Sequence, residues 1–168
     1  MDKTTWTDLR IHIQKTSEQL KLDIKPIGFH TWPAVEYRVV HKFTGDDRVR
    51  LTWMWEERIL DSFDHADKHI PQFTEMCDIF RAIICADEPL WLFIEDNLRL
   101  KTKFWGYSDT IGSILALLGE LPGLDFYIAS KKLEWVAGQN HSDVIFAYGD
   151  LAEKLRGYLA HGKSGEID

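Results

Sequence analysis

The residues best equipped for chemistry are Asn140-His141-Ser142-Asp143, a polar insert between two apolar runs. A histidine followed two residues later by an aspartate can act as a general base with an orienting carboxylate. The same residues suit a hairpin turn, because Asn and Asp tolerate left-handed backbone and form local hydrogen bonds. No serine or cysteine lies nearby in a nucleophile-elbow context. The pattern therefore favours a turn, and a catalytic pair of His141 and Asp143 is the alternative.

His65 and His69 form an H-x-x-x-H pattern within an acidic stretch, residues 56–70. On a helix, imidazoles four residues apart share a face and can bind a divalent metal, with Asp61 one turn earlier. However, no glutamate follows His65 as in the H-E-x-x-H pattern, and Pro71 lies close behind. We therefore expect a solvated surface segment, a loop or a short helix, and neither a metal nor another cofactor. A metal site at His65 and His69 is the alternative.

A third polar pattern is the ladder of Arg99, Lys101 and Lys103, which alternates along one predicted strand. Such a ladder can bind an anion, but it is more typical of a solvent-facing strand beside acidic neighbours. The sequence contains no phosphate-binding glycine loop, no dinucleotide fingerprint and no Cys-x-x-Cys pair. Nothing in it therefore argues for an enzyme.

Composition and charge narrow the class of protein. The chain has 168 residues and 45% hydrophobic content, which predicts one globular domain with a frayed tail at 161–168. The first residues lack the apolar core of a signal peptide, and the two cysteines, Cys77 and Cys85, are expected to be reduced and to share one helix. A cytoplasmic protein is the expectation. The net charge of −7 disfavours nucleic acid and anionic membranes as partners.

The same acidity suits a protein that covers a basic protein partner. The acidic stretch would present the charge, and an aromatic side chain beside it would anchor the contact, since tryptophan is enriched at binding hot spots. The predicted partner-binding residues are Trp55, Glu56, Glu57, Asp61, Asp64 and Asp67. A stoichiometric binding protein is the favoured function. A small hydrolase or metal-assisted enzyme, or a small-ligand sensor with a pocket lined by Trp91, Trp105 and Trp135, are the alternatives.

Hydrophobic periodicity predicts the elements that position these residues. Helices are expected over 5–22, 71–86 and 109–121, and from residue 149 or 150 onward. Strands are expected in a hairpin over 35–55, with a helix from Thr52 as the competing interpretation, in a second hairpin over 89–107, and over 125–130, 133–137 and 143–148. Together they predict an α+β fold, an antiparallel sheet of about six strands with helices packed mainly on one face.

Three motifs carry a resemblance to an uncharacterised family of small bacterial proteins. They are Lys103-Phe104-Trp105-Gly106-Tyr107, residues 127–135 (YIASKKLEW) and residues 140–144 (NHSDV). The family patterns are K-F-W-x-Y, Y-I-V-S-K-K-x-x-W and N-H-H-D-V, so Ser142 stands where the second histidine is expected. Small acidic bacterial proteins of this kind are similar to immunity proteins of toxin systems, which implies a cognate toxin as the partner.

Overall fold

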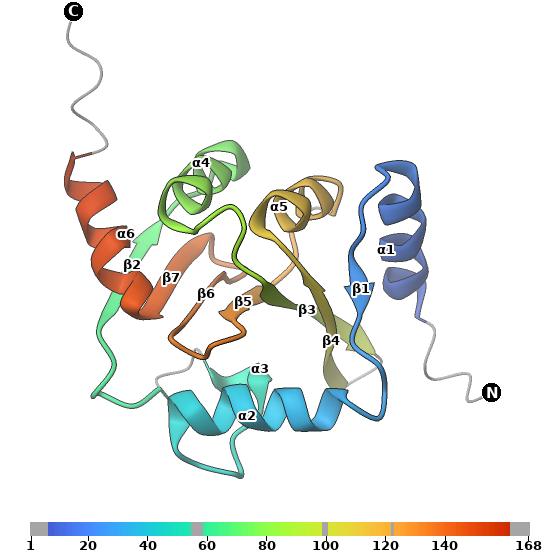
Figure 1. Ribbon diagram of the computed structural model, residues 1–168, viewed down its shortest axis with the longest axis horizontal. Coiled ribbons are helices and arrows are strands. Elements are labelled where there is room, and N and C mark those ends of the chain that lie inside the picture. Colours follow the sequence, from blue (N-terminus) through green and yellow to red (C-terminus); the bar gives the residue numbers. More distant parts are fainter. Residues whose placement is uncertain (1–6, 55–58, 99–100, 122, 162–168) are drawn as a thin grey trace, which may run out of the picture.

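A computed structural model describes residues 7–54, 59–98, 101–121 and 123–161. Its seven strands are β1 (Lys25–Pro26), β2 (His65–His69), β3 (Leu90–Leu98), β4 (Lys101–Asp109), β5 (Phe126–Ser130), β6 (Trp135–Gln139) and β7 (Val144–Gly149). They form one sheet in the order β1-β4-β3-β5-β6-β7-β2, and every neighbouring pair is antiparallel (Figure 1). The edges of the sheet are therefore β1 and β2.

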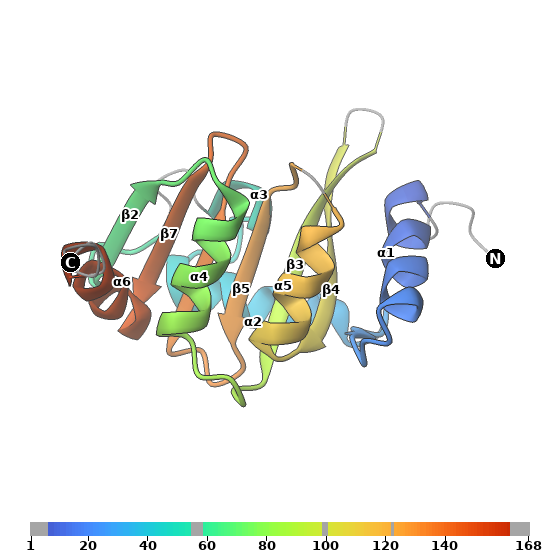
Figure 2. The ribbon, with the colours of Figure 1, turned by 90° about the horizontal axis from the view of Figure 1, so that it is seen from above.

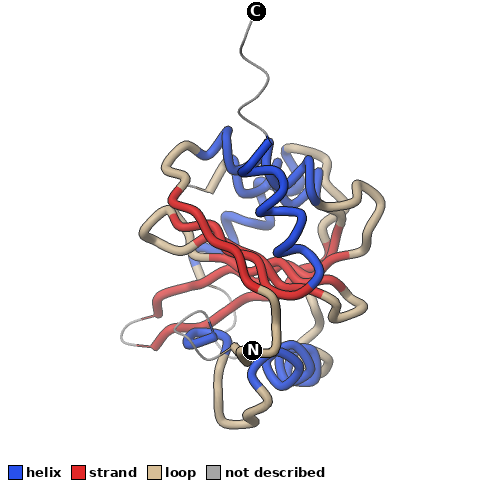
Figure 3. The backbone as a smooth tube through the Cα atoms, turned by 90° about the vertical axis from the view of Figure 1, so that its left-hand side faces the viewer, coloured by secondary structure: helices blue, strands red, loops and turns tan. Residues whose placement is uncertain are grey.

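Helices lie on both faces of this sheet (Figure 3). In the described part of the chain, one face carries α1 (Asp8–Gln19), α4 (Phe73–Ile83), α5 (Ile111–Gly119) and α6 (Asp150–His161). Figure 2 looks onto this face, with α4 and α5 in front of the strands and α1 and α6 toward the two sides. The opposite face carries α2 (Trp32–Thr44) and the short α3 (Leu51–Met54). The predicted α+β class is confirmed, with seven strands instead of about six and with most helices on one face.

Strand β3 shows why a continuous apolar run belongs in the middle of such a sheet. Leu90, Leu92 and Ile94 are buried against the four-helix face, and Trp91 and Phe93 are buried against α2. Successive side chains of a strand point to opposite faces, so a strand covered on both sides is apolar at every position. The β3 strand accordingly lies in the interior of the sheet, between β4 and β5.

The hairpin predicted over 35–55 is wrong, because α2 and α3 occupy this stretch. Its core side chains are Val35, Val39, Val40 and Phe43, whose spacing follows one face of a helix. Pro33 is in the first turn and Gly45, at φ 66°, ends the helix. A strand would place Val35, Tyr37 and Val39 on the same buried face. In the structure the two valines are buried but Tyr37 is 50% exposed, so the alternation does not reflect a strand.

The acidic stretch is predicted to be a loop or a surface helix, but it contains the edge strand β2, which pairs with β7.

Cys77 is buried in α4, whereas Cys85 lies beyond the end of that helix and is exposed. The prediction that the two cysteines share one helix is therefore wrong; both thiols are free. Helix α6 continues through His161, and residues 162–168 of the predicted tail lie outside the described residues. Within the described ranges, no helix has the length and apolarity needed to cross a bilayer.

Candidate functional site

Residues 140–143 form the tight turn between β6 and β7, as predicted. Asn140 Oδ1 accepts hydrogen bonds from the backbone N–H groups of Ser142 (3.0 Å) and Val144 (3.2 Å). Asp143 has φ 56°, the left-handed conformation that Asn and Asp tolerate best among residues with a side chain. The Asn140 side chain therefore holds the turn.

The carboxylate that holds the His141 ring is Asp125, not Asp143. His141 Nδ1 lies 3.0 Å from Asp125 Oδ2, although the two residues are 16 positions apart. The antiparallel pairing explains the contact, since Phe126 of β5 faces Gln139 of β6 and brings the preceding residue beside the turn. His141 has 66% of its side chain exposed and Asp125 only 14%. A solvent-facing imidazole thus stands on a recessed carboxylate.

Glu95 of β3 completes this cluster, and its backbone N–H donates to the Asp125 carbonyl at 2.9 Å. Burial, and then repulsion from the Asp125 carboxylate, raises the pKa of Glu95. The hydrogen bond that the ring makes to the Asp125 carboxylate, together with the charge of that carboxylate, raises the pKa of His141. Two carboxyl groups and one imidazole therefore lie together at this end of the sheet, an arrangement typical of acid–base sites but also of structural ion pairs.

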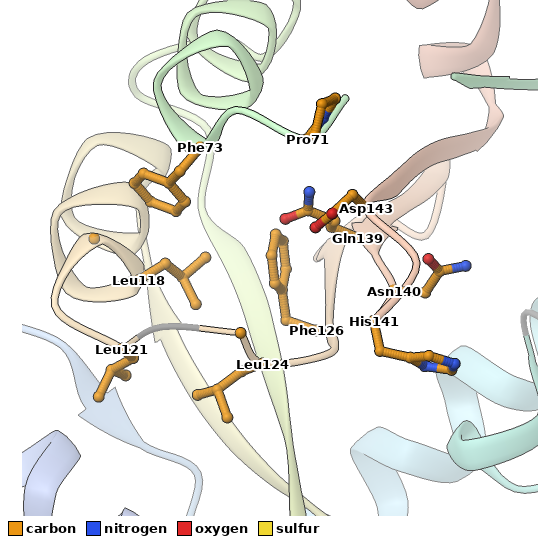
Figure 4. A pocket seen from close by; sticks show the side chains of 12 residues that line it. Pro71, Phe73, Leu118, Leu121, Leu124, Phe126, Gln139, Asn140, His141 and Asp143 are labelled. Atoms are coloured by element: carbon orange, nitrogen blue, oxygen red, sulfur yellow. The ribbon is translucent and has the colours of Figure 1, made fainter. Parts of the chain in front are cut away.

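A pocket of about 360 Å³ lies beside the turn (Figure 4). Its wall is apolar and includes Phe73, Leu118 and Phe126, with Gln139 and Asp143 on the side of the turn. Gln139 donates to the carbonyl of Ile70 at 3.3 Å, so its amide is used in the fold. His141 is at the rim, and Figure 4 shows its ring pointing away from the apolar wall. The imidazole faces solvent more than it faces the pocket.

Two of the six predicted partner-binding residues, Asp64 and Asp67, make ion pairs within the fold. Trp55, Glu56 and Glu57 lie outside the described residues. Arg156 makes a forked ion pair with Asp64 and also donates to the His65 carbonyl at 2.8 Å, and this hydrogen bonding lowers the pKa of Asp64. Asp67 lies 2.8 Å from His65 Nε2. Asp61 is exposed, and no ion pair to it is found among the described residues.

The alternative metal site requires His65 and His69 to share one face of a helix. They are instead the first and last residues of strand β2. Four residues of strand span about 13 Å, too far for two imidazoles to bind one ion. His65 stacks on Tyr148 of the neighbouring strand, with ring centroids 4.7 Å apart. Within the ranges that the structure describes, no group of three or more His, Cys, Asp or Glu side chains has a metal-binding arrangement.

The three tryptophans proposed to line one pocket are not brought together. Trp91 is buried on the α2 face of the sheet, whereas Trp105 and Trp135 are buried on the opposite face. Trp105 is on β4 and Trp135 on β6, with β3 and β5 between them. Each tryptophan is part of the core at its own position.

Sequence reasoning missed a surface at the C-terminal end of α2, here called the α2 surface: Tyr37, His41, Asp46, Asp47, Leu60 and Asp61. The Tyr37 ring stacks on His41 (centroids 5.3 Å apart, 12° between planes), and both residues contact Asp47 Oδ1, at 3.3 Å from the tyrosine hydroxyl and 2.6 Å from His41 Nδ1. Leu60, 43% exposed, packs on the Gly45 end of the helix. If this stretch is read as a helix, Tyr37 lies away from the buried valines. A large aromatic residue on that exposed side is the sequence signal for this surface.

A hollow of about 330 Å³ lies beside Tyr37, between α2 and the loop that follows it. Glu36, Asp46 and Asp47 contribute three carboxylates to its wall, and Arg50 contributes a guanidinium. Arg48 pairs with Asp46 at 3.1 Å. Burial raises the pKa of Glu36, partly offset by a backbone hydrogen bond at Leu51 and by Arg50. The hollow thus combines an aromatic wall with carboxylates.

Comparison with known proteins assigns a family without an activity. No curated protein and no solved structure matches the chain. A model of one protein family matches residues 5–158, nearly the whole chain, and that family is described as being of unknown function. The resemblance to an uncharacterised family is confirmed to that extent. The chain belongs to the family of unknown function DUF6756.

Proposed function

We propose that this protein is a stoichiometric binding protein that covers a basic protein partner with its α2 surface, and that its role is to neutralise that partner, as a bacterial immunity protein neutralises its toxin. The observation that carries the proposal is Tyr37, a large side chain that is 50% exposed and yet held in place by His41 and Asp47. An exposed aromatic side chain fixed before binding loses little conformational entropy on association.

The composition of the α2 surface supports a protein partner. Tyrosine is enriched at binding hot spots, and hot spots lie among apolar neighbours that exclude water. Leu60 supplies such a neighbour at 43% exposure. The hollow beside Tyr37 has room for one long basic side chain, whose stem would lie on the tyrosine ring and whose charge would meet Asp47.

Charge supports a basic partner. The chain carries a net charge of −7, and Asp47 and Asp61 place carboxylates next to the exposed apolar groups. Long-range attraction of this kind accelerates association and is weakened by salt. The proposed contact is centred on the α2 surface, because the exposed side chains of Tyr37 and Leu60 lie there.

Loss of the Tyr37 side chain should weaken partner binding. The partner is captured from the source cells, identified, purified, and titrated by calorimetry with a 1:1 stoichiometry expected. Tyr37→Ala should raise Kd by about 30-fold or more, the equivalent of roughly 2 kcal/mol at a hot spot. Ile11→Ala is the matched control, since Ile11 is 38% exposed on α1, on the other face of the sheet. Equal weakening by both changes would refute the assigned surface.

The role of charge is tested with Asp61→Lys against Glu75→Lys, an exposed residue of α4. Both changes alter the net charge equally, so a difference between them reports position. Asp61→Lys should slow association and flatten its salt dependence, and Glu75→Lys should do so much less. Neutralisation is tested by co-expressing the partner: wild type should restore growth and Tyr37→Ala should not. A partner that is harmless alone would remove the immunity role and leave the binding proposal standing.

A second candidate function, hydrolysis with His141 as general base, is favoured by one observation: Asp125 orients the imidazole at 3.0 Å. In this candidate mechanism the orienting carboxylate is that of Asp125, and not that of Asp143 as the sequence suggested. Asp125→Asn should lower the pKa of His141 toward its ordinary value of about 6.5, as followed by NMR titration of the ring protons. In the enzyme, His141→Ala and Asp125→Asn should each reduce turnover about 100-fold, and Asp143→Asn should not.

The sign of the accompanying pH effect follows from the raised pKa of His141. The folded state binds the proton more tightly than the unfolded chain, so the ion pair stabilises the fold fully below the unfolded pKa. That contribution is lost as pH rises through the folded pKa. The effect should be small, because 66% of the His141 side chain is exposed. The hydrolase proposal would be refuted if a broad substrate screen found no turnover. If His141→Ala also left partner binding unchanged, the contact between His141 and Asp125 would have only a structural role.

A further inference from the structure

The pocket beside the turn between β6 and β7, shown in Figure 4, is here called the turn pocket. Its volume of about 360 Å³ is within the range of small-molecule sites. The apolar wall includes Phe73 of α4, Leu118 of α5 and Phe126 of β5. Leu118 and Phe126 are each 3% exposed, whereas Phe73 is 38% exposed. One aromatic ring of this wall is therefore accessible from solvent.

The polar side of the turn pocket presents oxygen acceptors. Gln139 Nε2 donates to the Ile70 carbonyl at 3.3 Å, which leaves Oε1 of the same amide for the cavity. Figure 4 shows the polar ends of Gln139 and Asp143 turned toward Phe126, whereas the His141 ring points away. An ionised carboxylate accepts hydrogen bonds and donates none. A ligand of this pocket therefore has to be a donor.

The backbone of Asp143 is fixed by the turn, and its carboxylate is left for a ligand. The Asp143 N–H donates to the Asn140 carbonyl at 3.0 Å, and the Asp143 carbonyl accepts from the Ile70 N–H at 2.7 Å. Within the ranges that the structure describes, no hydrogen bond or ion pair to the Asp143 carboxylate is found. A group that is positioned before the ligand arrives lowers the entropic cost of binding.

The end of helix α5 adds negative potential to the same cavity. Leu118 and Gly119 are the last two residues of this helix, and both line the pocket. The C-terminus of a helix carries the equivalent of roughly half a negative charge, so a cation close to it is stabilised. The last turn of α5 contains no basic residue. The helix end and the Asp143 carboxylate therefore both favour a positively charged ligand.

We propose that the turn pocket binds a small organic amine, whose ammonium group donates to Asp143 and Gln139. The apolar body of the amine packs on Phe73, Leu118 and Phe126. An ammonium group has three N–H donors and no acceptor, which matches a site made of acceptors. The apolar wall suits an organic cation better than Ca²⁺ or Mg²⁺, since these ions are surrounded by oxygen ligands.

This site is separate from both functions proposed above. The turn pocket lies on the face of the sheet opposite to α2, and it uses none of the residues of the α2 surface. It also does not depend on the His141 ring, which Figure 4 shows pointing away from the apolar wall. A failure of the amine proposal would therefore leave the protein-binding proposal intact.

The probe is 3-phenylpropan-1-amine, and matched compounds isolate its features. The alcohol 3-phenylpropan-1-ol has no charge, 3-phenylpropanoate has the opposite charge, and methylamine has no apolar body. Calorimetry and saturation-transfer NMR on the full chain, at about pH 8 where the amine keeps its proton, should show a millimolar or lower Kd for the amine. Each matched compound should bind at least about 10-fold more weakly. Equal affinity of the amine and the alcohol would overturn the ammonium assignment, and no binding of the amine would overturn the site.

Asp143→Asn removes the charge of the carboxylate and keeps its shape. Asparagine also tolerates φ 56°, so the turn should remain and Tm should change little. The variant should bind the amine about 10-fold more weakly than wild type does, with the affinity for the alcohol unchanged. Asp61→Asn makes the same chemical change on the α2 surface and should leave the affinity for the amine unchanged. Equal weakening by both variants would mean that the amine responds to net charge and not to the pocket.

The apolar wall is tested with Phe73→Ala against Phe29→Ala, since Phe29 is 48% exposed and does not line the turn pocket. Phe73→Ala should weaken binding of the amine and of the alcohol by the same factor, because both carry the phenyl group. Phe29→Ala should weaken neither. In the wild-type protein, nuclear Overhauser contacts from the phenyl ring of the amine to Phe73 and Phe126 should locate the ligand whatever the stability of the variants. A bound amine without these contacts would overturn the assigned pocket.

Discussion

Gly138→Ala is expected to lower the free energy of unfolding by more than about 3 kcal/mol, the range of severe core changes. A Cβ atom at position 138 would lie 2.1 Å from the backbone carbonyl oxygen of Phe126 and 2.8 Å from Cζ of Phe146. The first contact is with the backbone of the paired strand β5, which cannot move without breaking the ladder between Tyr127 and Gly138. The glycine thus permits the close approach of β5 and β6 that also places Asp125 beside His141.

Gly112→Ala is the matched control for this change. A Cβ at position 112, in the first turn of α5, meets no atom within 4 Å. Alanine is the better helix former, so this variant should be unchanged or more stable by about 0.5–1 kcal/mol. Urea denaturation of both variants measures the contrast. If Gly138→Ala loses less than about 1 kcal/mol, β5 and β6 are not packed as described.

The elements with a single dominant pattern were predictable from the sequence. The run of buried residues in β3 and the apolar stripe of α5, which includes Ile111, Ile114 and Leu118, each allow one secondary structure. Helix α2 was missed because Val35, Tyr37 and Val39 alternate over a few residues. Valine is β-branched and is common in strands, so the composition of this stretch also favoured the incorrect strand assignment. The buried positions Val40 and Phe43 complete the helical stripe, and they decide the assignment.

The candidate sites depend on contacts between distant residues, which local patterns do not encode. His141 and Asp143 are close in the sequence, which suggests a pair. In the turn, however, the His141 ring contacts Asp125, and Asp143 takes the left-handed backbone conformation. The partner Asp125 follows from the register of β5 and β6, which becomes known only with the pairing of Phe126 and Gln139. Asp64 likewise looked free to bind until folding brought Arg156, 92 residues away, to it.

Gly106→Ala should produce the second large effect, through the docking of α2 on the sheet. A Cβ at position 106 would lie 2.2 Å from Cζ3 and 2.5 Å from Cε3 of Trp32. Trp32 is at the start of α2, and its ring packs against Phe93 of β3 with centroids 5.3 Å apart. A rigid indole cannot yield as a flexible side chain can. Overpacking at such a position is expected to cost about 1–3 kcal/mol and to loosen the first turn of α2.

A double-mutant cycle with Trp32→Ala separates this clash from a general intolerance of Gly106 to substitution. Removing the indole takes away the two closest contacts and leaves only Cδ1 of Ile27, the flexible end of a side chain, at 2.9 Å. Gly106→Ala should therefore cost much less in the Trp32→Ala background, with a coupling energy of roughly 1 kcal/mol or more. Additive effects would mean that the clash with Trp32 is not the cause. Since α2 carries Tyr37, Gly106→Ala should also weaken partner binding without changing any residue of the α2 surface. Full affinity in a destabilised Gly106→Ala protein would show that the α2 surface keeps its geometry when the start of the helix is displaced.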